Sequence, residues 1–504
     1  MKSVTILTIA AMAMAAATGC SHDNPTPSPE PPVKGGEFNE FGFTTTAPVT
    51  LSVDYGDMAG MPANVYFEVY DTCPVEETET AYAKIAGVEP LYAGYTDGQG
   101  RFEGTIELPA YIRKAYVLTP AFYARTLLEA TRSGDMLTAS AESGAPANAA
   151  PASTRAKEYH STAVERDGWK TWLGSYDTTY GSIGYEYDGD LKVKNYGALL
   201  KAHASVFDTT KKCPKEYRSS RDLYLEKSAE VVITLLGSNT CWNSSMGYYY
   251  YKTGNKPKSL ADANVVMIFP NTQDGRWSNS PWESRLYQGV ERGTAVQLIY
   301  YPEIADGSKA GATTVFPADY RIGFVLATNA WTNRLRAGDK KYRAATSDGL
   351  SVNNNGVAYQ TPRTAVFRYT DKKSGINSVL FSFEDHTNDE NFSDVVFTMT
   401  SNPVDAVTDI PSVDVNDGKK TANVLRGIYA FEDLWPSRGD YDMNDVMVRS
   451  DYEKVFNEKG VFEESFMLKT FANFAGNANG LAVTLTGAAA DAKLEFSVRK
   501  PGAE

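Results

Sequence analysis

An acidic stretch close to the C-terminal end limits how this chain can fold more than any other feature of its sequence. Apolar runs typical of β-strands lie on both sides of it, at residues 424–431 and 446–448. Carboxylates held this close repel one another unless a cation or hydrogen-bond donors compensate their charge. Oxygen atoms at alternate positions of a tight loop are ligands that suit calcium. The candidate ligands are Glu432, Asp433, Asp440, Asp442, Asn444 and Asp445.

A second, less acidic copy of the pattern lies at residues 383–397. Both copies open with Phe-Glu-Asp and close with an Asp that three apolar residues follow, and an apolar, strand-like run precedes each. Strand, acidic loop, strand is therefore used twice, with a longer loop in the later copy. The candidate ligands of the earlier copy are Glu384, Asp385, Asp389, Asn391 and Asp394; Asp389, Asn391, Ser393 and Asp394 align with Asp440, Asp442, Asn444 and Asp445.

Two interpretations of these loops stay open. The loops could bind calcium, or their carboxylates could cap turns and accept hydrogen bonds from backbone N–H groups. The spacing of Asp440, Asp442 and Asn444 is that of the start of an EF-hand. We reject an EF-hand because Asp445 stands where that loop needs glycine and a strand-like run follows. Strict alternation along a strand predicts that either the Glu or the Asp of Phe-Glu-Asp points inward, but not both.

Residues 431–448 resemble the signature of the LruC-domain bacterial surface lipoproteins: a strand, Phe-Glu-Asp, a short loop, Asp-x-Asp-x-Asn-Asp and a β-rich run. Residues 383–397 resemble the related module that precedes it in such proteins. The resemblance extends over residues 40–504, with a divergent region at 126–165. It implies a surface lipoprotein and no established enzymatic activity. Further landmarks of the family lie at residues 246–249, 268–271 and 321–326.

The N-terminal segment is typical of a lipoprotein signal peptide at residues 1–19. Lys2 supplies the positive start, an apolar middle follows, and small residues precede Cys20, the expected lipid acceptor. An ordinary secretory signal that is cleaved elsewhere is the alternative. Residues 20–39 form a Pro-rich tether. We therefore expect an outer membrane lipoprotein, held to the membrane through lipid at Cys20, that faces the periplasm or is exposed at the cell surface.

Three cysteines remain after that processing: Cys73, Cys213 and Cys241. An oxidising compartment permits one disulfide among them. Cys213 and Cys241 are the nearer pair in sequence, but spacing alone does not establish the bond. Three unpaired core thiols are the alternative.

The length of 504 residues predicts several domains. Many short strands separated by Gly, Pro, Asn and Asp turns predict a mainly β fold of successive antiparallel sandwich or jelly-roll-like domains with a few short helices. We expect the helices at residues 191–204 and 219–228. The expected domains are a β-sandwich at 40–125, a linker or long loop at 126–165, a β-rich domain at 166–410 that ends in the earlier acidic loop, and a C-terminal LruC-type domain at 419–504 that we expect to be truncated.

In the first of these domains, the hairpin at residues 96–102 resembles that of transthyretin-like and carboxypeptidase-regulatory-like modules. Such modules are usually spacers or adhesive units. Asp97 could be a ligand, but a turn-forming Asp is the preferred interpretation.

Composition and motifs exclude several classes of function. The net charge of −13 and the absence of a basic block argue against nucleic-acid binding. Four scattered histidines make a histidine-based zinc site improbable. Nucleophile-elbow, phosphate-loop and metalloprotease motifs are absent, although a carboxylate pair could still serve a glycoside hydrolase. The aromatic residues Tyr248 to Tyr251, Trp242, Trp277, Trp282 and Trp331 are expected in the core rather than on a carbohydrate platform.

Together these features predict a non-enzymatic, calcium-stabilised surface protein that adheres or binds a glycan or protein ligand. A structural or pilus-like subunit is the alternative.

Overall fold

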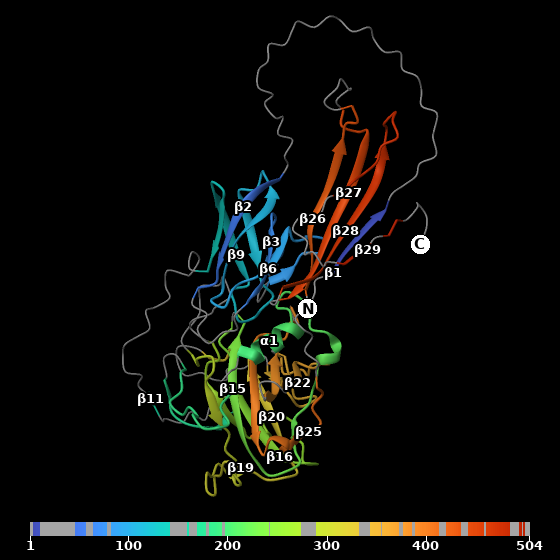
Figure 1. Cartoon of the computed structure of the whole chain (residues 1–504). Helices are drawn as coiled ribbons and strands as arrows, with labels where there is room; N and C mark the ends of the chain where they lie inside the picture. Colours follow the sequence, from blue (N-terminus) through green and yellow to red (C-terminus); the bar gives the residue numbers. More distant parts are fainter. Residues whose placement is uncertain are drawn as a thin grey trace, which may run out of the picture.

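The computed structural model of the chain (Figure 1) describes residues 4–10, 46–56, 64–77, 82–141, 159–160, 169–177, 181–193, 197–240, 242–273, 289–331, 343–353, 355–371, 376–385, 389–412, 420–434, 442–457, 460–483, 493–495 and 497–498. Within these ranges strands dominate, and several separate sheets confirm the predicted mainly β, multi-domain fold. No helix among them is long and apolar enough to cross a membrane.

The first domain is one sheet of seven strands in the order β6-β3-β8-β9-β10-β2-β7. Apolar side chains at alternate positions of β2 (Val49, Leu51 and Val53) are buried, as period-two patterning requires. Asp97 accepts hydrogen bonds from the backbone N–H groups of Gln99 and Arg101, which confirms its role in a turn. The strands are β2 (Thr46–Asp54), β3 (Tyr66–Tyr70), β6 (Tyr92–Tyr95), β7 (Arg101–Pro109), β8 (Lys114–Leu118), β9 (Leu127–Ser133) and β10 (Met136–Ser140), with a separate hairpin of β4 (Val75–Glu77) and β5 (Tyr82–Lys84).

The predicted linker at residues 126–165 is wrong over its first part, because β9 and β10 belong to this sheet. Ala130 and Ala139 alternate with polar residues and are fully buried. Alanine fits a tightly packed interior face, so a composition rich in Ala, Ser and Thr concealed a strand pattern. The first domain therefore extends to residue 140 rather than 125.

Two sheets packed face to face form the second domain. One has the order β12-β17-β16-β20-β14-β25, with β21 paired to β20; the other has the order β18-β15-β24-β23-β22, with β19 paired to β15. The ring centroid of Phe324 lies 5.1 Å from that of Phe381 and 4.9 Å from that of Phe397, across the two layers. Their strands are β12 (Trp169–Trp172), β14 (Leu223–Leu225), β15 (Ala229–Ser238), β16 (Ser245–Lys252), β17 (Val265–Phe269), β18 (Ala295–Gln297), β19 (Val315–Phe316), β20 (Tyr320–Ala327), β21 (Arg343–Ala345), β22 (Thr364–Asp371), β23 (Ile376–Phe383), β24 (Val395–Asn402) and β25 (Val407–Thr408).

Several aromatic residues with a possible role in carbohydrate binding lie in this core. Tyr248, Tyr249 and Trp331 are buried, which confirms the core interpretation for them. Trp277 and Trp282 lie outside the described residues.

Helix α1 (Gly197–Val206) packs on the outer face of the sheet that contains β23 and β24. Its Leu199 and Leu200 belong to a buried apolar cluster that also contains residues of the first domain, such as Phe122 and Leu128. The two domains therefore share one core.

The helix begins later than predicted, and the second predicted helix is wrong, since residues 219–228 contain β14. The other helical segments are the 3-10 turns η2 (Lys215–Tyr217), η3 (Ile304–Asp306) and η4 (Val404–Ala406), and a two-stranded pair is formed by β11 (Tyr159–His160) and β13 (Tyr176–Asp177).

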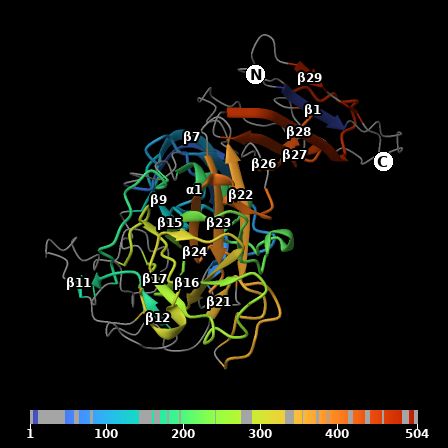
Figure 2. The same cartoon turned by 90° about the horizontal axis from the view of Figure 1, so that it is seen from below.

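The C-terminal module is a sheet that projects from the rest of the molecule (Figures 1 and 2). Its base contacts the first domain, where Phe456 packs between Tyr66 and Tyr95. Part of the predicted signal peptide forms β1 in this sheet, parallel to β28. The sheet has the order β26-β27-β28-β1-β29, from β1 (Val4–Ala10), β26 (Lys420–Phe431), β27 (Val446–Asn457), β28 (Gly460–Asn473) and β29 (Lys493–Glu495).

Cys20 and Cys241 lie outside the described residues. Cys213 is a buried free thiol and Cys73 a half-buried one. The Cys213–Cys241 disulfide that sequence spacing permitted is therefore not formed.

Candidate metal centre

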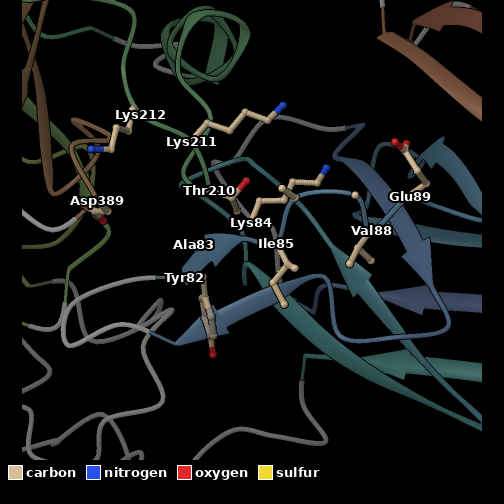
Figure 3. Close-up of a pocket in the computed structure, with 12 residues that line it drawn as sticks. Tyr82, Ala83, Lys84, Ile85, Val88, Glu89, Thr210, Lys211, Lys212 and Asp389 are labelled. Atoms are coloured by element: carbon tan, nitrogen blue, oxygen red, sulfur yellow. The ribbon is translucent and has the colours of Figure 1, made fainter.

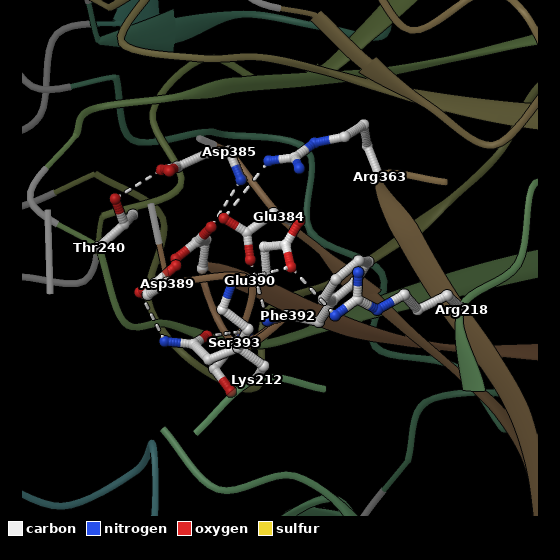
Figure 4. A network of polar contacts seen from close by, with 12 residues as sticks. Lys212, Arg218, Thr240, Arg363, Glu384, Asp385, Asp389, Glu390, Phe392 and Ser393 are labelled. Atoms are coloured by element: carbon white, nitrogen blue, oxygen red, sulfur yellow. Dashed lines mark hydrogen bonds and ion pairs between the residues drawn. The ribbon is translucent and has the colours of Figure 1, made fainter. Parts of the chain in front are cut away.

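The earlier acidic loop joins β23 to β24 and brings three carboxylates together. Oxygen atoms of Glu384, Asp385 and Asp394 all lie within 4.8 Å of one another. Glu384 is 0% exposed and Asp394 3% exposed, so the cluster lies inside the protein. Figure 4 shows Glu384 and Asp385 in the surrounding polar network. Both Glu384 and Asp385 take part, which contradicts the prediction that only one of them points inward. The physical reason is that β23 ends at Phe383, so strand alternation no longer applies to the next two residues.

Backbone and side-chain donors each hold one oxygen of these carboxylates. The N–H of Asp385 donates to Asp394 Oδ2 (2.5 Å), and the N–H of Phe392 donates to Glu384 Oε2 (3.1 Å). The hydroxyl of Thr240 donates to Asp385 Oδ2 (2.5 Å). Backbone amides therefore bind two of the three carboxylates, as the turn interpretation predicts for these side chains.

One carboxylate oxygen and one hydroxyl of this loop are less well satisfied. Glu384 Oε1 is buried without a hydrogen bond, and its nearest cation is the guanidinium of Arg363, whose Nη2 lies 3.4 Å away. The hydroxyl of Ser393 is also buried without a hydrogen-bond partner. Buried oxygens of this kind are costly unless something else binds them.

The remaining candidates of this loop divide between the cluster and the surface. Asn391 Nδ2 donates to Asp389 Oδ2 (2.7 Å), and its Oδ1 accepts the N–H of Ser393 (2.7 Å). Glu390 points away and pairs with Arg218 (3.2 Å) and Lys212 (3.4 Å). Asp389 and Asn391 therefore lie at the rim of the cluster, whereas Glu390 serves the surface.

Burial dominates the electrostatics of the cluster. Desolvation raises the pKa of Asp385 to about 7, and it raises the pKa values of Glu384 and Asp394 well above their usual range. Repulsion between neighbouring carboxylates adds to the shift, while Arg363 opposes it for Glu384. These shifts favour the protonated carboxyl groups, so either protons or a cation would stabilise the cluster.

The later loop, between β26 and β27, repeats the arrangement. Oxygen atoms of Glu432, Asp433 and Asp445 again lie within 4.8 Å of one another, here half-buried. The N–H of Asp433 donates to Asp445 Oδ2 (2.8 Å), which is the counterpart of the Asp385–Asp394 contact. Asp442 accepts the N–H of Asn444 (3.3 Å) at the exposed edge of the loop. Asp440 lies outside the described residues.

Both loops bend at the same position. Phe392 has a φ of 58° and Met443 a φ of 55°, each two residues before the closing Asp. A positive φ is unfavourable for such side chains, so its recurrence reflects a shared loop geometry rather than chance.

Sequence reasoning missed the residues that come from other parts of the chain. Thr240 follows β15, and Arg363 precedes β22; neither carries a motif. Only a prediction of which strands pair with β23 and β24 could have found them.

A cleft with a volume of about 540 Å³ reaches the rim of the cluster at Asp389 (Figure 3). Its lysines already have carboxylate partners: Lys84 pairs with Glu68 (2.9 Å) and Lys211 with Asp208 (3.3 Å). The cleft is therefore not organised as a site for anions.

Comparison with family models finds two matches. Residues 47–141 match a domain of unknown function (DUF8469), and residues 316–402 match another (DUF4114). The first match spans the seven-stranded sheet, and the second includes the earlier acidic loop. A search of curated proteins and one of solved structures find no match.

Proposed function

We propose that both acidic loops bind a divalent cation, and that calcium is that cation. The observation that carries the proposal is the buried triad of Glu384, Asp385 and Asp394, whose oxygens converge within 4.8 Å. With Asp389 at the rim, four carboxylates have the guanidinium of Arg363 as their nearby cation among the described residues. A hard cation with a preference for carboxylate oxygens would remove their repulsion and fix the loop.

At the level of the whole protein, we propose a non-enzymatic surface lipoprotein that adheres or binds an extracellular glycan or protein. The lipobox at Cys20 and the Pro-rich tether support anchoring in the outer membrane. Protease treatment of intact cells tests exposure: loss of the chain supports a surface location, and full protection favours a periplasm-facing one.

Calcium is expected to raise the melting temperature of the purified chain by about 5–10 °C at a concentration 100 times the dissociation constant, because binding to the folded state alone adds about 2.7 kcal/mol. Calorimetry should resolve two binding events. Asp394→Asn should remove one of them and Asp445→Asn the other, since each retains the shape of the side chain but loses its charge.

Asp405→Asn is the matched control, because Asp405 is an exposed carboxylate that pairs with Lys227. It should leave both events intact. A wild-type chain that gives neither heat nor a change in melting temperature with calcium would remove the proposal.

Asp442→Ala is expected to lower the melting temperature of the C-terminal module only in the presence of calcium. Asp442 is exposed, and its described hydrogen bonds are to Asn444. Without calcium, its loss should therefore cost little. Parallel melts in calcium and in chelator measure the difference. Equal destabilisation in both conditions would contradict a ligand role for this residue.

A structural or pilus-like subunit is a second candidate, because the C-terminal sheet exposes large apolar side chains. Tyr429 is 47% exposed, Phe431 43% and Phe471 44%. Exposed apolar patches of this kind often mark assembly surfaces. Electron microscopy of the purified chain tests this candidate, which predicts filaments.

A further inference from the structure

The two acidic loops belong to modules that agree beyond the loops themselves. In each module the strand after the loop has a second neighbour besides the strand before it: β24 pairs with β15, and β27 pairs with β28, both antiparallel. The module is therefore three strands, β23-β24-β15 in the first case and β26-β27-β28 in the second.

The register of the third strand is the same in both modules. The first residue after the closing Asp is Val395 in the first module, where it pairs with Ser238, and Val446 in the second, where it pairs with Asn473. The second residue after the closing Asp is Val396, which pairs with Gly237, or Met447, which pairs with Ala472.

One residue of the third strand is then skipped before pairing resumes, at Leu236 in the first module and at Phe471 in the second. A β-bulge at the same place bends both third strands in the same way.

The third strand continues to the carboxylate cluster along the same path. The N–H of Asn239 donates to the carbonyl oxygen of Asp394 (3.1 Å), and the N–H of Phe474 donates to that of Asp445 (3.0 Å). Just beyond, the Thr240 hydroxyl contacts Asp385 Oδ2, and the Asn477 amide contacts Asp433 Oδ2 (3.0 Å). Each cluster thus meets a neutral polar side chain from the segment that follows the third strand, and the second cluster also meets the more distant Asn479 amide (3.5 Å).

The order of the strands along the chain differs. β15 precedes its acidic loop by more than a hundred residues, whereas β28 follows its loop with only β27 between them. The same three-dimensional arrangement is therefore completed from opposite chain directions. The order of the strands along the chain does not explain why the two modules agree. What the two modules share is the geometry around the carboxylate cluster.

We propose that the third strand supplies a ligand to each cation: Thr240 in the first module and Asn477 in the second. This inference rests on the proposed calcium binding. Calcium takes six to eight oxygens, more than three carboxylates supply as single-oxygen ligands. The Thr240 hydroxyl accepts the N–H of Trp242 (3.1 Å) and offers its other lone pair when its hydrogen turns away from Asp385. Asn477 offers its Oδ1 when its amide turns over.

An independent feature of the first cluster points to a ligand. Glu384 Oε1 is fully buried and makes no hydrogen bond, and the Arg363 guanidinium lies 3.4 Å away. An ion held between Glu384, Asp385 and Thr240 would bind this oxygen more closely than the Arg363 guanidinium does. It would also join β15 to the β23–β24 hairpin, so that calcium fastens three strands rather than one loop.

The test for the first module is Thr240→Val in an Asp445→Asn background, where only the first site can bind. Calorimetric titration with calcium should show affinity at least about 10-fold weaker than in the background alone, the loss of one ligand being worth about 1.4 kcal/mol. Thr400→Val is the matched control, because the Thr400 hydroxyl bonds only a backbone carbonyl, that of Leu191, elsewhere on the same sheet. Unchanged affinity in Thr240→Val would overturn the inference for this module.

The second module supplies a test that does not depend on a buried substitution, since Asn477 is exposed. In an Asp394→Asn background, Asn477→Leu should weaken calcium binding and Asn477→Asp should tighten it, because a carboxylate is a stronger ligand than an amide. Equal affinities for the two variants would overturn the inference here.

The two proposals fail differently. If the wild-type chain binds no calcium, calcium binding itself is wrong. If the wild type binds calcium and the variants at residues 240 and 477 bind it equally well, only the third-strand ligands are wrong.

Discussion

In the presence of a chelator, the free energy of unfolding should fall as the pH rises from about 5 to about 8, and calcium should abolish that fall. Burial raises the pKa of Asp385 from 3.8 to about 7, so the folded chain holds a proton there that the unfolded chain has released. A carboxyl group with a raised pKa contributes stability that is fully present below its unfolded pKa. That stability is lost as the pH rises through the folded pKa.

The effect is large because several carboxylates share the site. Each unit of pKa shift corresponds to about 1.4 kcal/mol, so Asp385 alone contributes several kcal/mol over this range. Glu384 and Asp394 shift in the same direction. Calcium would replace the protons and keep the carboxylates ionised, which removes the pH dependence.

Denaturant unfolding at a series of pH values, with calcium and with chelator, measures the difference between the two profiles. Glu384→Gln should flatten the profile in chelator, since glutamine does not titrate. Parallel profiles in the two conditions would count against cation binding at this cluster.

A second large effect is expected at His203, with the opposite sign. This histidine of α1 is fully buried, and desolvation lowers its pKa from 6.5 to about 3. A depressed pKa contributes stability that is present above pH 6.5 and is lost as the pH falls through the folded value. Between pH 6.5 and about 3, the unfolded chain takes up a proton at His203 that the folded chain does not bind.

His203→Phe should therefore reduce the acid sensitivity of the chain by about 2–3 kcal/mol near pH 4.5. Phenylalanine retains the ring contacts that His203 makes with Phe122 (4.6 Å between centroids) and Phe207 (4.5 Å), although it loses the hydrogen bond to Ser382.

Ser382→Ala is the control: it removes that hydrogen bond alone and should leave the pH dependence in place. The readout is the difference between wild type and variant at each pH, which cancels the opposing contribution of the carboxylates. An acid sensitivity that persists in His203→Phe would place its origin elsewhere.

Local patterns in the sequence predicted much of the candidate site. Phe-Glu-Asp and the closing Asp mark where strands stop and start, and the structure brings Glu384, Asp385 and Asp394 together as that pattern suggests. The alternation argument failed because it treated residues beyond the strand end as part of the strand. Their inward direction is set instead by the hydrogen bond from the Asp385 N–H to Asp394.

Long-range pairing was beyond the reach of the sequence. Thr240 is separated from Asp385 by 145 residues, and nothing near Thr240 marks it as part of an acidic cluster. Similarly, Ala130 and Ala139 look like linker residues until the neighbouring strands that bury them are known. Composition describes a segment by itself, whereas burial depends on what covers it.

The shared core of the first two domains has a mechanical consequence. The predicted tether precedes β2, which is hydrogen-bonded on one side to β7 and on the other to β10. Tension applied through a lipid anchor would pull along β2 and load those hydrogen bonds in shear, many at once, instead of opening them one after another. The load would pass through the apolar cluster that this sheet shares with α1 into the sandwich, so that the two domains would resist stretching together.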